Sequence, residues 1–134
     1  MLLVDTNVLI DVLQDDPQWA DWSLAQLRAQ SQLHALAINP VIYAEMSLSF
    51  STLEGLDAVV GELGLELHEL PRPALFLAGK AFVRYRRLGG HKQQVLPDFF
   101  IGAHAAVQGW PLLTRDAARF RTYFPRLRVL APGA

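Results

Sequence analysis

Short apolar segments alternate with longer helix-like segments along the whole chain, and this alternation constrains the fold more than any other feature. Strands are predicted at 2–4, 33–38, 65–70, 111–114 and 128–130, and helices at 7–14, 17–32, 40–50, 53–63, 73–88, 97–108 and 117–123. Strands separated by helices are joined by crossover connections, which build a parallel sheet with helices on both faces. The sequence therefore predicts an α/β fold around a central, mainly parallel β-sheet.

The length and composition indicate one globular unit. The chain has 134 residues, which is the size of an ordinary domain. Hydrophobic residues make up 51% and charged residues 19%, a balance that excludes the class of disordered proteins. Because the chain has no cysteine, a disulfide framework and a thiolate metal site are also excluded. We expect a single domain over residues 1–134.

The first residues predict no signal peptide, because an acid occurs already at Asp5 and no basic segment precedes it. No apolar run approaches the length that a membrane-spanning helix requires. We therefore expect a cytoplasmic protein with no membrane partner.

The charges are divided unevenly between the two parts of the chain, although the formal net charge is only −1. Residues 1–79 hold 11 acids and 2 bases, whereas residues 80–134 hold 2 acids and 10 bases. A basic C-terminal part can supply lysine and arginine contacts to phosphates. The charge is compatible with binding to nucleic acid but does not by itself identify it.

Three acids stand where predicted strands end or a helix begins. Asp5 follows the strand at 2–4 and Asp116 follows the strand at 111–114, so both are expected at the carboxyl edge of the sheet. In parallel sheets, ligands bind beyond this edge. Asp98 lies in the first turn of its predicted helix. Each acid alone has a local alternative, because a carboxylate at a helix start also caps the helix or meets the positive end of its dipole.

Glu45 has no such local explanation. At about 100° per residue, it falls on the apolar side of its predicted helix, between Val41 and Leu48 on one side and Ile42 on the other. An acid there is unfavourable unless it is paired, hydrogen-bonded, protonated or bound to a metal. The main alternative is a salt bridge to an arginine, which must come from a distant part of the chain because no Lys or Arg lies between positions 28 and 72.

The four carboxylates have little basic compensation nearby, which favours a site for a hard divalent cation such as Mg²⁺ or Mn²⁺. They are Asp5, Glu45, Asp98 and Asp116. Zinc is disfavoured, because the histidines lack the HExxH spacing and cysteine is absent. Acids that hold one or two such ions suit phosphodiester hydrolysis, since the metal generates hydroxide and stabilises the leaving oxygen. A phosphatase with Asp5 as nucleophile is less favoured, because Asn7 stands where a second Asp is usual.

Four segments resemble, in the same order, the sequence blocks of PIN-domain nucleases, especially the toxins of VapBC toxin–antitoxin modules. They are LVDTNVLI at 3–10, NPVIYAE at 39–45, PDFFIGAHA at 97–105, and LTRD at 113–116 with Phe120. Each block alone is weak, whereas the ordered set is fairly specific and spans nearly the whole chain. The resemblance implies a single PIN domain over 1–134, Mg²⁺ or Mn²⁺ dependence, endoribonuclease activity and a cognate VapB-type antitoxin.

The same resemblance implies roles for individual residues. Asp5 and Asp98 would be the principal metal ligands, Glu45 a direct or water-mediated ligand, and Asp116 a support for a second metal or for the attacking water. The neighbouring side chains that would orient these acids are those of Thr6, Asn7 and Thr114. Their alternative role is local turn and cap hydrogen bonding.

Candidates for binding RNA and partners lie outside these blocks. Lys80, Arg84 and Arg87 share a helical face and are candidates for contacts to RNA phosphates, with a solvated helix as the alternative. Trp19 and Trp22 are expected in the core, with an antitoxin or dimer surface as the alternative. We expect a homodimer. Two other functions stay open, a PIN-domain nuclease of RNA processing that is not a toxin and a catalytically silent PIN-like interaction protein.

Overall fold

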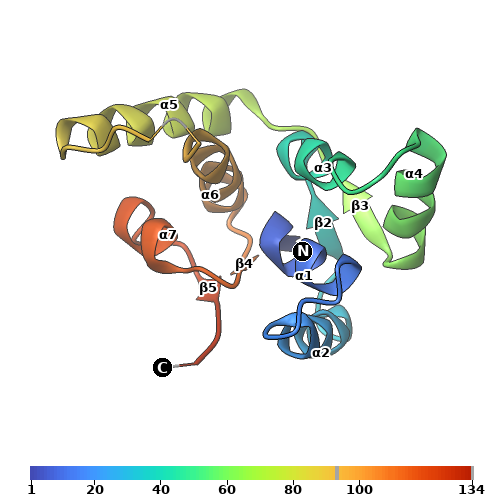
Figure 1. Ribbon diagram of the computed structural model, residues 1–134. Helices are drawn as coiled ribbons and strands as arrows, with labels where there is room; N and C mark the ends of the chain where they lie inside the picture. Colours follow the sequence, from blue (N-terminus) through green and yellow to red (C-terminus); the bar gives the residue numbers. More distant parts are fainter. Residues whose placement is uncertain (93, 134) are drawn as a thin grey trace.

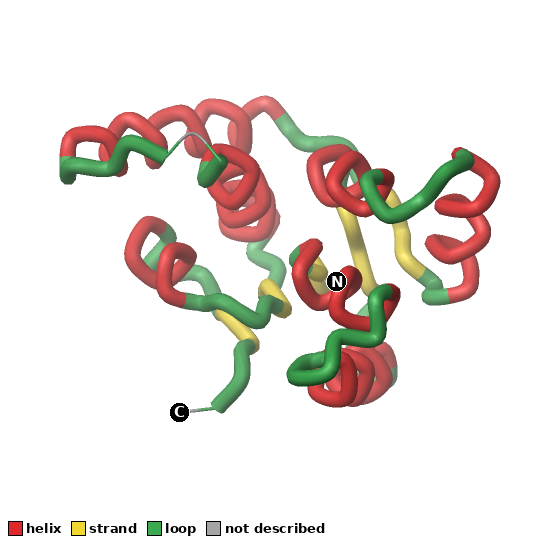
Figure 2. Tube along the Cα trace, viewed as in Figure 1, coloured by secondary structure: helices red, strands yellow, loops and turns green. Residues whose placement is uncertain are grey.

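The computed structural model describes residues 1–92 and 94–133 and confirms the predicted alternation of strands and helices. In chain order the elements are β1 (Leu2–Val4), α1 (Thr6–Leu13), α2 (Ala20–Ser31), β2 (Leu36–Ile38), α3 (Pro40–Ser47), α4 (Leu53–Glu62), β3 (Leu65–Leu67), α5 (Arg72–Arg87), α6 (Leu96–Gln108), β4 (Leu112–Leu113), α7 (Ala118–Tyr123) and β5 (Val129–Leu130). Figure 2 shows the short strands in the middle of the molecule with the helices around them.

The sheet has the strand order β3-β2-β1-β4-β5, and every neighbouring pair is parallel (Figure 1). The first strand lies at the centre, because Leu2 pairs with Leu36 of β2 while Leu3 pairs with Leu112 of β4. From β1 the chain moves outward to β3 and then crosses to β4 and β5 on the other side. Right-handed crossovers in these two directions place helices on opposite faces of the sheet. The predicted α/β fold is confirmed.

The three central strands, β1, β2 and β4, are buried because helices cover both faces, which explains why they read as continuous apolar runs rather than alternating ones. Leu2, Leu3, Ile38, Leu112 and Leu113 are completely buried. Full burial of a side chain of this size contributes about 1.5–3 kcal/mol. These residues form the centre of the core, and the loops that follow the strands are therefore held at fixed positions.

The predicted helix at 17–32 begins later than expected, at Ala20. The reason is a turn that Asp16 organises, since its Oδ1 accepts hydrogen bonds from the backbone N–H groups of Gln18 and Trp19, both at 2.9 Å. An aspartate that caps a turn in this way competes with helix formation. The predicted strands at 33–38, 65–70, 111–114 and 128–130 are likewise shorter in the structure.

Helices α5 and α6 pack side by side and share an aromatic cluster with α7 and the residue that follows it (Figure 1). Phe99 of α6 lies at its centre, with ring centroids 5.6 Å from Tyr85, 5.9 Å from Phe82, 5.1 Å from Tyr123 and 6.4 Å from Phe124. Aromatic pairs at such separations add to the energy of burial. The cluster fixes the start of α6, where Asp98 precedes Phe99. Within the described residues, no helix combines the length and apolar character needed to cross a membrane.

Candidate functional site

Asp5 lies between the end of β1 and the start of α1 and belongs to both. Its backbone N–H donates to the Leu113 carbonyl of β4 at 2.8 Å, and its side chain caps α1 through Oδ1, which accepts from the Thr6 N–H at 2.8 Å. The other carboxylate oxygen, Oδ2, accepts from the Thr114 hydroxyl at 2.7 Å. Asp5 therefore does cap a helix, and it also joins the ends of two neighbouring strands.

The carboxyl group of Asp5 is only 4% exposed, and this burial raises its pKa from 3.8 to about 7. The hydrogen bonds from Thr114 and Thr6 lower the pKa, whereas the negative charges of Asp98 and Glu45 raise it further. Burial disfavours the charged form, and nearby like charges add to that effect. The residue is thus an acid whose charge is poorly compensated by its surroundings.

Glu45 reaches the same place from α3. Its Oε1 accepts a hydrogen bond from the Thr6 hydroxyl at 2.7 Å, so the partner is a hydroxyl group rather than an arginine. Burial raises the pKa of Glu45, the bond from Thr6 lowers it, and the charge of Asp98 raises it. The apolar surroundings predicted for Glu45 were partly wrong, because α3 ends at Ser47 and Leu48 is 88% exposed.

Asp98 lies in the first turn of α6 and is half-buried. Its Oδ2 accepts from Nη1 of Arg119 at 2.6 Å, whereas the cap of α6 is Val95, which makes no side-chain cap bond. The pKa of Asp98 is raised, mainly by burial and also by the charge of Asp116, although the hydrogen bond and charge of Arg119 lower it. Asp98 therefore does not cap α6, but it lies in the first turn as predicted, where a carboxylate meets the positive end of the helix dipole.

The side chain of Asp116 is exposed, and the hydrogen bonds of this residue to Thr114 are made by its backbone. Its N–H donates to the Thr114 hydroxyl oxygen at 3.1 Å, while in the described part of the chain its carboxylate makes no hydrogen bond. Its negative charge raises the pKa of Asp98, so the two side chains lie near each other. Asp116 is the least embedded of the four acids and does not cap α7, whose N-cap is Ala117.

Thr114 connects the two ends of the chain at this edge of the sheet. Its hydroxyl donates to Asp5 and accepts from Nδ2 of Asn7 at 3.4 Å, while Oδ1 of Asn7 accepts from the Arg115 N–H at 3.2 Å. Thr6 makes the corresponding link to Glu45. The side chains of Thr6, Asn7 and Thr114 thus bond across long sequence separations and not only to local turns.

The model of the PIN domain family matches residues 2–124, a span that includes all four acids. The chain belongs to the PIN domain family. PIN domains are nucleases, so the family acts by hydrolysis of nucleic acid. The comparison with curated proteins gave no match.

Solved structures agree on the PIN fold. VapBC2 from Rickettsia felis, bound to a DNA fragment from its promoter, has a TM-score of 0.74 at 17% identity, with 98% of each chain covered. DNA-bound VapBC from Salmonella typhimurium has a TM-score of 0.71 at 21% identity, covering 97% of this chain and 96% of that one. VapBC-1 from nontypeable Haemophilus influenzae has a TM-score of 0.71 at 16% identity, with the same coverage. At these identities the similarity establishes the fold alone.

An ion pair that the sequence did not predict, between Asp11 of α1 and Arg115, lies next to Thr114 and Asp116 in the chain. Asp11 is 2% exposed, and its oxygens accept from Nε of Arg115 at 2.8 Å and from Nη2 at 3.0 Å, while the Ser23 hydroxyl donates at 3.0 Å. The guanidinium also lies 5.6 Å from the Trp19 ring centroid. This pair fastens the loop that carries Thr114 to α1. The available sequence signal was weak, since spacing alone does not pair residues 104 apart.

The proposed RNA contacts lie on α5. Lys80, Arg84 and Arg87 are exposed there, with Lys80 Nζ 5.0 Å from the Phe76 ring centroid and Arg84 Cζ 5.4 Å from that of Tyr123. No hydrogen bond in the described residues links these three bases to the four acids. Their role in RNA binding stays a prediction.

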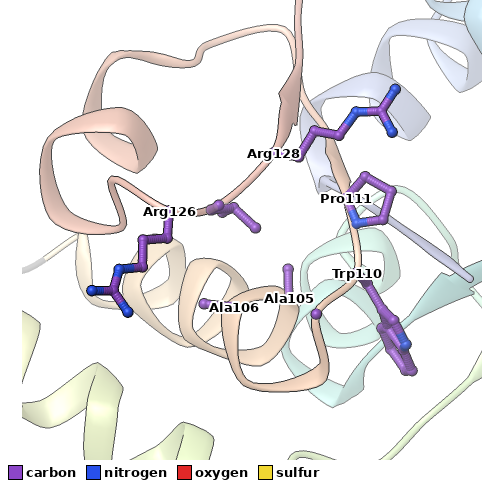
Figure 3. A pocket seen from close by; sticks show the side chains of 8 residues that line it. Ala105, Ala106, Trp110, Pro111, Arg126 and Arg128 are labelled. Atoms are coloured by element: carbon purple, nitrogen blue, oxygen red, sulfur yellow. The ribbon is translucent and has the colours of Figure 1, made fainter.

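A pocket of about 230 Å³ lies at the other end of β4 and is a different place from the acidic site (Figure 3). Its lining comprises Ala105, Ala106, Gly109, Trp110, Pro111, Arg126, Leu127 and Arg128, none of them acidic. Pro111 precedes β4, whereas Thr114 follows it. Figure 3 shows Arg126 and Arg128 extending in different directions, so the pocket presents no convergent pair of charges.

The donor atoms of the acidic site fit a hard divalent cation in their chemistry. Three carboxylates, those of Asp5, Glu45 and Asp98, have raised pKa values because they are partly buried and repel one another, and a divalent cation relieves that repulsion. As the side chains stand in the described residues, no three acidic or histidine groups form a ready ligand set. Oδ2 of Asp98 is bonded to Arg119, so ligation through that oxygen requires this contact to open, whereas the bond from Thr6 involves only Oε1 of Glu45.

Proposed function

We propose that this PIN domain is a metal-dependent endoribonuclease and the toxin of a type II toxin–antitoxin module of the VapBC kind. The observation that supports it best is the gathering of Asp5, Glu45 and Asp98 at the carboxyl edge of the sheet in a member of a nuclease family. Partly buried acids with raised pKa values are typical of functional sites. A purely structural role does not explain three acids that destabilise one another.

In this proposal Asp5, Asp98 and Glu45 hold Mg²⁺ or Mn²⁺, and Asp116 lies beside them. Such a cation supplies Lewis-acid activation of water and of the scissile phosphate when it is bound. Thr114 and Thr6 orient the carboxylates of Asp5 and Glu45 through bonds of 2.7 Å each. These bonds hold the acids in fixed positions before substrate arrives.

Asp116 has a separate role in the proposal. Its carboxylate is exposed and makes no hydrogen bond within the described residues, so it can orient the water that attacks the phosphate or support a second cation. Its backbone N–H bonds to Thr114, which ties this exposed acid to the buried one at Asp5. Lys80, Arg84 and Arg87 would bind phosphates of the RNA away from the cleaved bond.

The partner in this proposal is a VapB-type antitoxin. The support comes from solved VapBC structures, which this chain resembles over 97–98% of its length. We also propose a homodimer in a cytoplasmic setting. A gene for a small DNA-binding protein directly beside the gene for this chain is expected, and its product should bind the purified chain. If no such neighbour exists, the chain is a PIN nuclease outside the toxin class.

The nuclease activity is tested with purified protein, single-stranded RNA and either Mg²⁺ or Mn²⁺. Wild type should cleave RNA, and Asp5→Asn or Asp98→Asn should abolish cleavage with the circular dichroism spectrum unchanged. The matched control is Asp21→Asn, which removes an exposed carboxylate on α2 and should cleave like wild type. Retained cleavage in both site variants would reject the assignment, and cleavage of DNA but not RNA would reject the substrate class.

A further inference from the structure

The acidic site contains a basic side chain of its own, that of Arg119. It lies on α7, and its Nη1 donates to Oδ2 of Asp98 at 2.6 Å. Among the described residues it is the only base bonded to any of the four acids, because Arg115 is bonded to Asp11 instead. Arg119 therefore occupies one of the two oxygens with which Asp98 could hold a cation, and its positive charge would oppose a cation at the other.

The contact between Arg119 and Asp98 rests on one hydrogen bond and is open to solvent. It is a single hydrogen bond to one carboxylate oxygen, unlike the two bonds that Arg115 makes to Asp11. The side chains of Arg119 and Asp98 are 31% and 33% exposed, so water can replace either partner. Ion pairs in contact with solvent contribute little free energy, whereas two-bonded arginine–carboxylate pairs contribute more.

Released arginine has a natural second partner in this site. If Asp98 held a divalent cation through this oxygen, the guanidinium of Arg119 would be left beside the acids as an unpaired positive charge. The planar guanidinium matches phosphate as well as carboxylate, and the substrate of a nuclease brings phosphate to this location.

We propose that Arg119 alternates between two anions, the Asp98 carboxylate in the metal-free protein and a phosphate of the RNA in the metal-loaded protein. This inference rests on the proposed function. It makes Arg119 a competitor of the cation and also a catalytic residue that contacts the substrate. Both effects follow from one side chain and have opposite signs, so they can be separated experimentally.

The experiment compares Arg119→Gln with wild type by two measurements. Isothermal titration with Mn²⁺, without RNA, should show binding that is about 3–10-fold tighter in Arg119→Gln, because the competing charge is gone. At saturating Mn²⁺, the same variant should cleave RNA with kcat/KM lower by about tenfold or more, because a donor to the phosphate is lost. Arg119→Lys keeps the charge, so its Mn²⁺ affinity and its kcat/KM should both lie between those of wild type and Arg119→Gln.

The matched control is Arg121→Gln, which removes an exposed positive charge from the same helix on a side lined by Gln26 and Gln30 of α2. It should change Mn²⁺ affinity by less than about twofold, because exposed charges at a distance are screened by salt.

Each other outcome overturns a defined part of the inference. Unchanged or weaker Mn²⁺ binding in Arg119→Gln would show that Arg119 does not compete with the cation. Tighter binding with unchanged kcat/KM would refute the contact to phosphate, and an equal effect of Arg121→Gln would reduce both to general electrostatics. If wild type itself binds no Mn²⁺, the metal site of the proposed function fails, and the inference fails with it.

Discussion

The helix that carries Asp98 packs closely against two aromatic rings at Gly102, and this contact gives a quantitative prediction for Gly102→Ala. A Cβ atom at Gly102 would overlap Cε2 of Phe124 and would lie 2.6 Å from its Cδ2 and 3.0 Å from Cδ1 of Phe120. Carbon atoms make favourable contact at about 3.5–4.0 Å. Both aromatic residues are buried, with exposed fractions of 4% and 2%, so the rings have little room to retreat. Gly102 is therefore required by this close approach.

The magnitude follows from two opposing terms. Alanine is favoured over glycine inside a helix by about 0.5–1 kcal/mol. Forcing an extra methyl group into a packed core costs about 1–3 kcal/mol, and the severity of this overlap favours the upper part of that range. The expected result is a net loss of about 1–2 kcal/mol in the free energy of unfolding. For a chain of this size each kcal/mol lowers Tm by roughly 3–5 °C.

The same substitution at Gly79 serves as the control. Gly79 lies in α5, is exposed, and a Cβ there would meet no atom within 4 Å. Gly79→Ala should therefore stabilise the protein by about 0.5–1 kcal/mol through helix propensity alone. Urea denaturation of the two metal-free variants should show a difference of about 2–3 kcal/mol between them. Equal stabilities would refute the reasoning, because the packing against Phe124 would then have no energetic effect.

Three further predictions concern the site itself. Because the pKa of Asp5 is raised from 3.8 to about 7, its contribution to stability is present at low pH and is lost as the pH rises toward and past 7. Between pH 5 and pH 8, metal-free wild type should therefore lose more stability in urea denaturation than Asp5→Asn, and parallel losses would contradict the shift. The opposing effect of His104, whose pKa burial lowers to about 4, is common to both proteins. Arg115→Ala should destabilise the protein by about 2–3 kcal/mol, because it leaves the buried carboxylate of Asp11 unpaired; this is less than for a fully buried pair, since Arg115 is 33% exposed. If Tm fell by less than about 3 °C, Asp11 would have found another partner. Thr114→Val should weaken Mn²⁺ binding at pH 7.5 by about 10–100-fold by removing the donor to Asp5, and Thr114→Ser should restore it; equal binding by both variants would argue against this role.

The alternation of apolar segments and helices was sufficient to predict the parallel sheet and to place Asp5 and Asp116 at its carboxyl edge. The strand order was beyond reach, because nothing in the local pattern says that β1 pairs with β4 more than 100 residues later. The pairing of Asp98 with Arg119 was missed for the same physical reason. Hydrophobic periodicity specifies which face of an element is buried, not which charged side chain of another element meets it.

For Glu45, the predicted lack of a local partner was correct, whereas its predicted apolar surroundings were only partly correct. The sequence marked it as an acid without a local partner, and the structure gives it the hydroxyl of Thr6. The apolar face predicted around Glu45 was wrong at Leu48. Helix α3 ends at Ser47, and the side chain of Leu48 is exposed to solvent. Helix ends depend on turn chemistry that is weaker than periodicity, as the late start of α2 after Asp16 also shows.

The central position of β1 has a consequence for the order in which the protein is made. Ribosomes synthesise β1 first, yet one of its two edges can pair only after β4 has been made. The hydroxyl that donates to Asp5 belongs to Thr114, which follows β4. The counter-ion of Asp98 follows later still, at Arg119. Contacts between such distant residues form only after the intervening chain exists. A nascent chain released before β4 therefore carries three of the acids but cannot assemble the site, which forms only after the residues up to Arg119 have been synthesised.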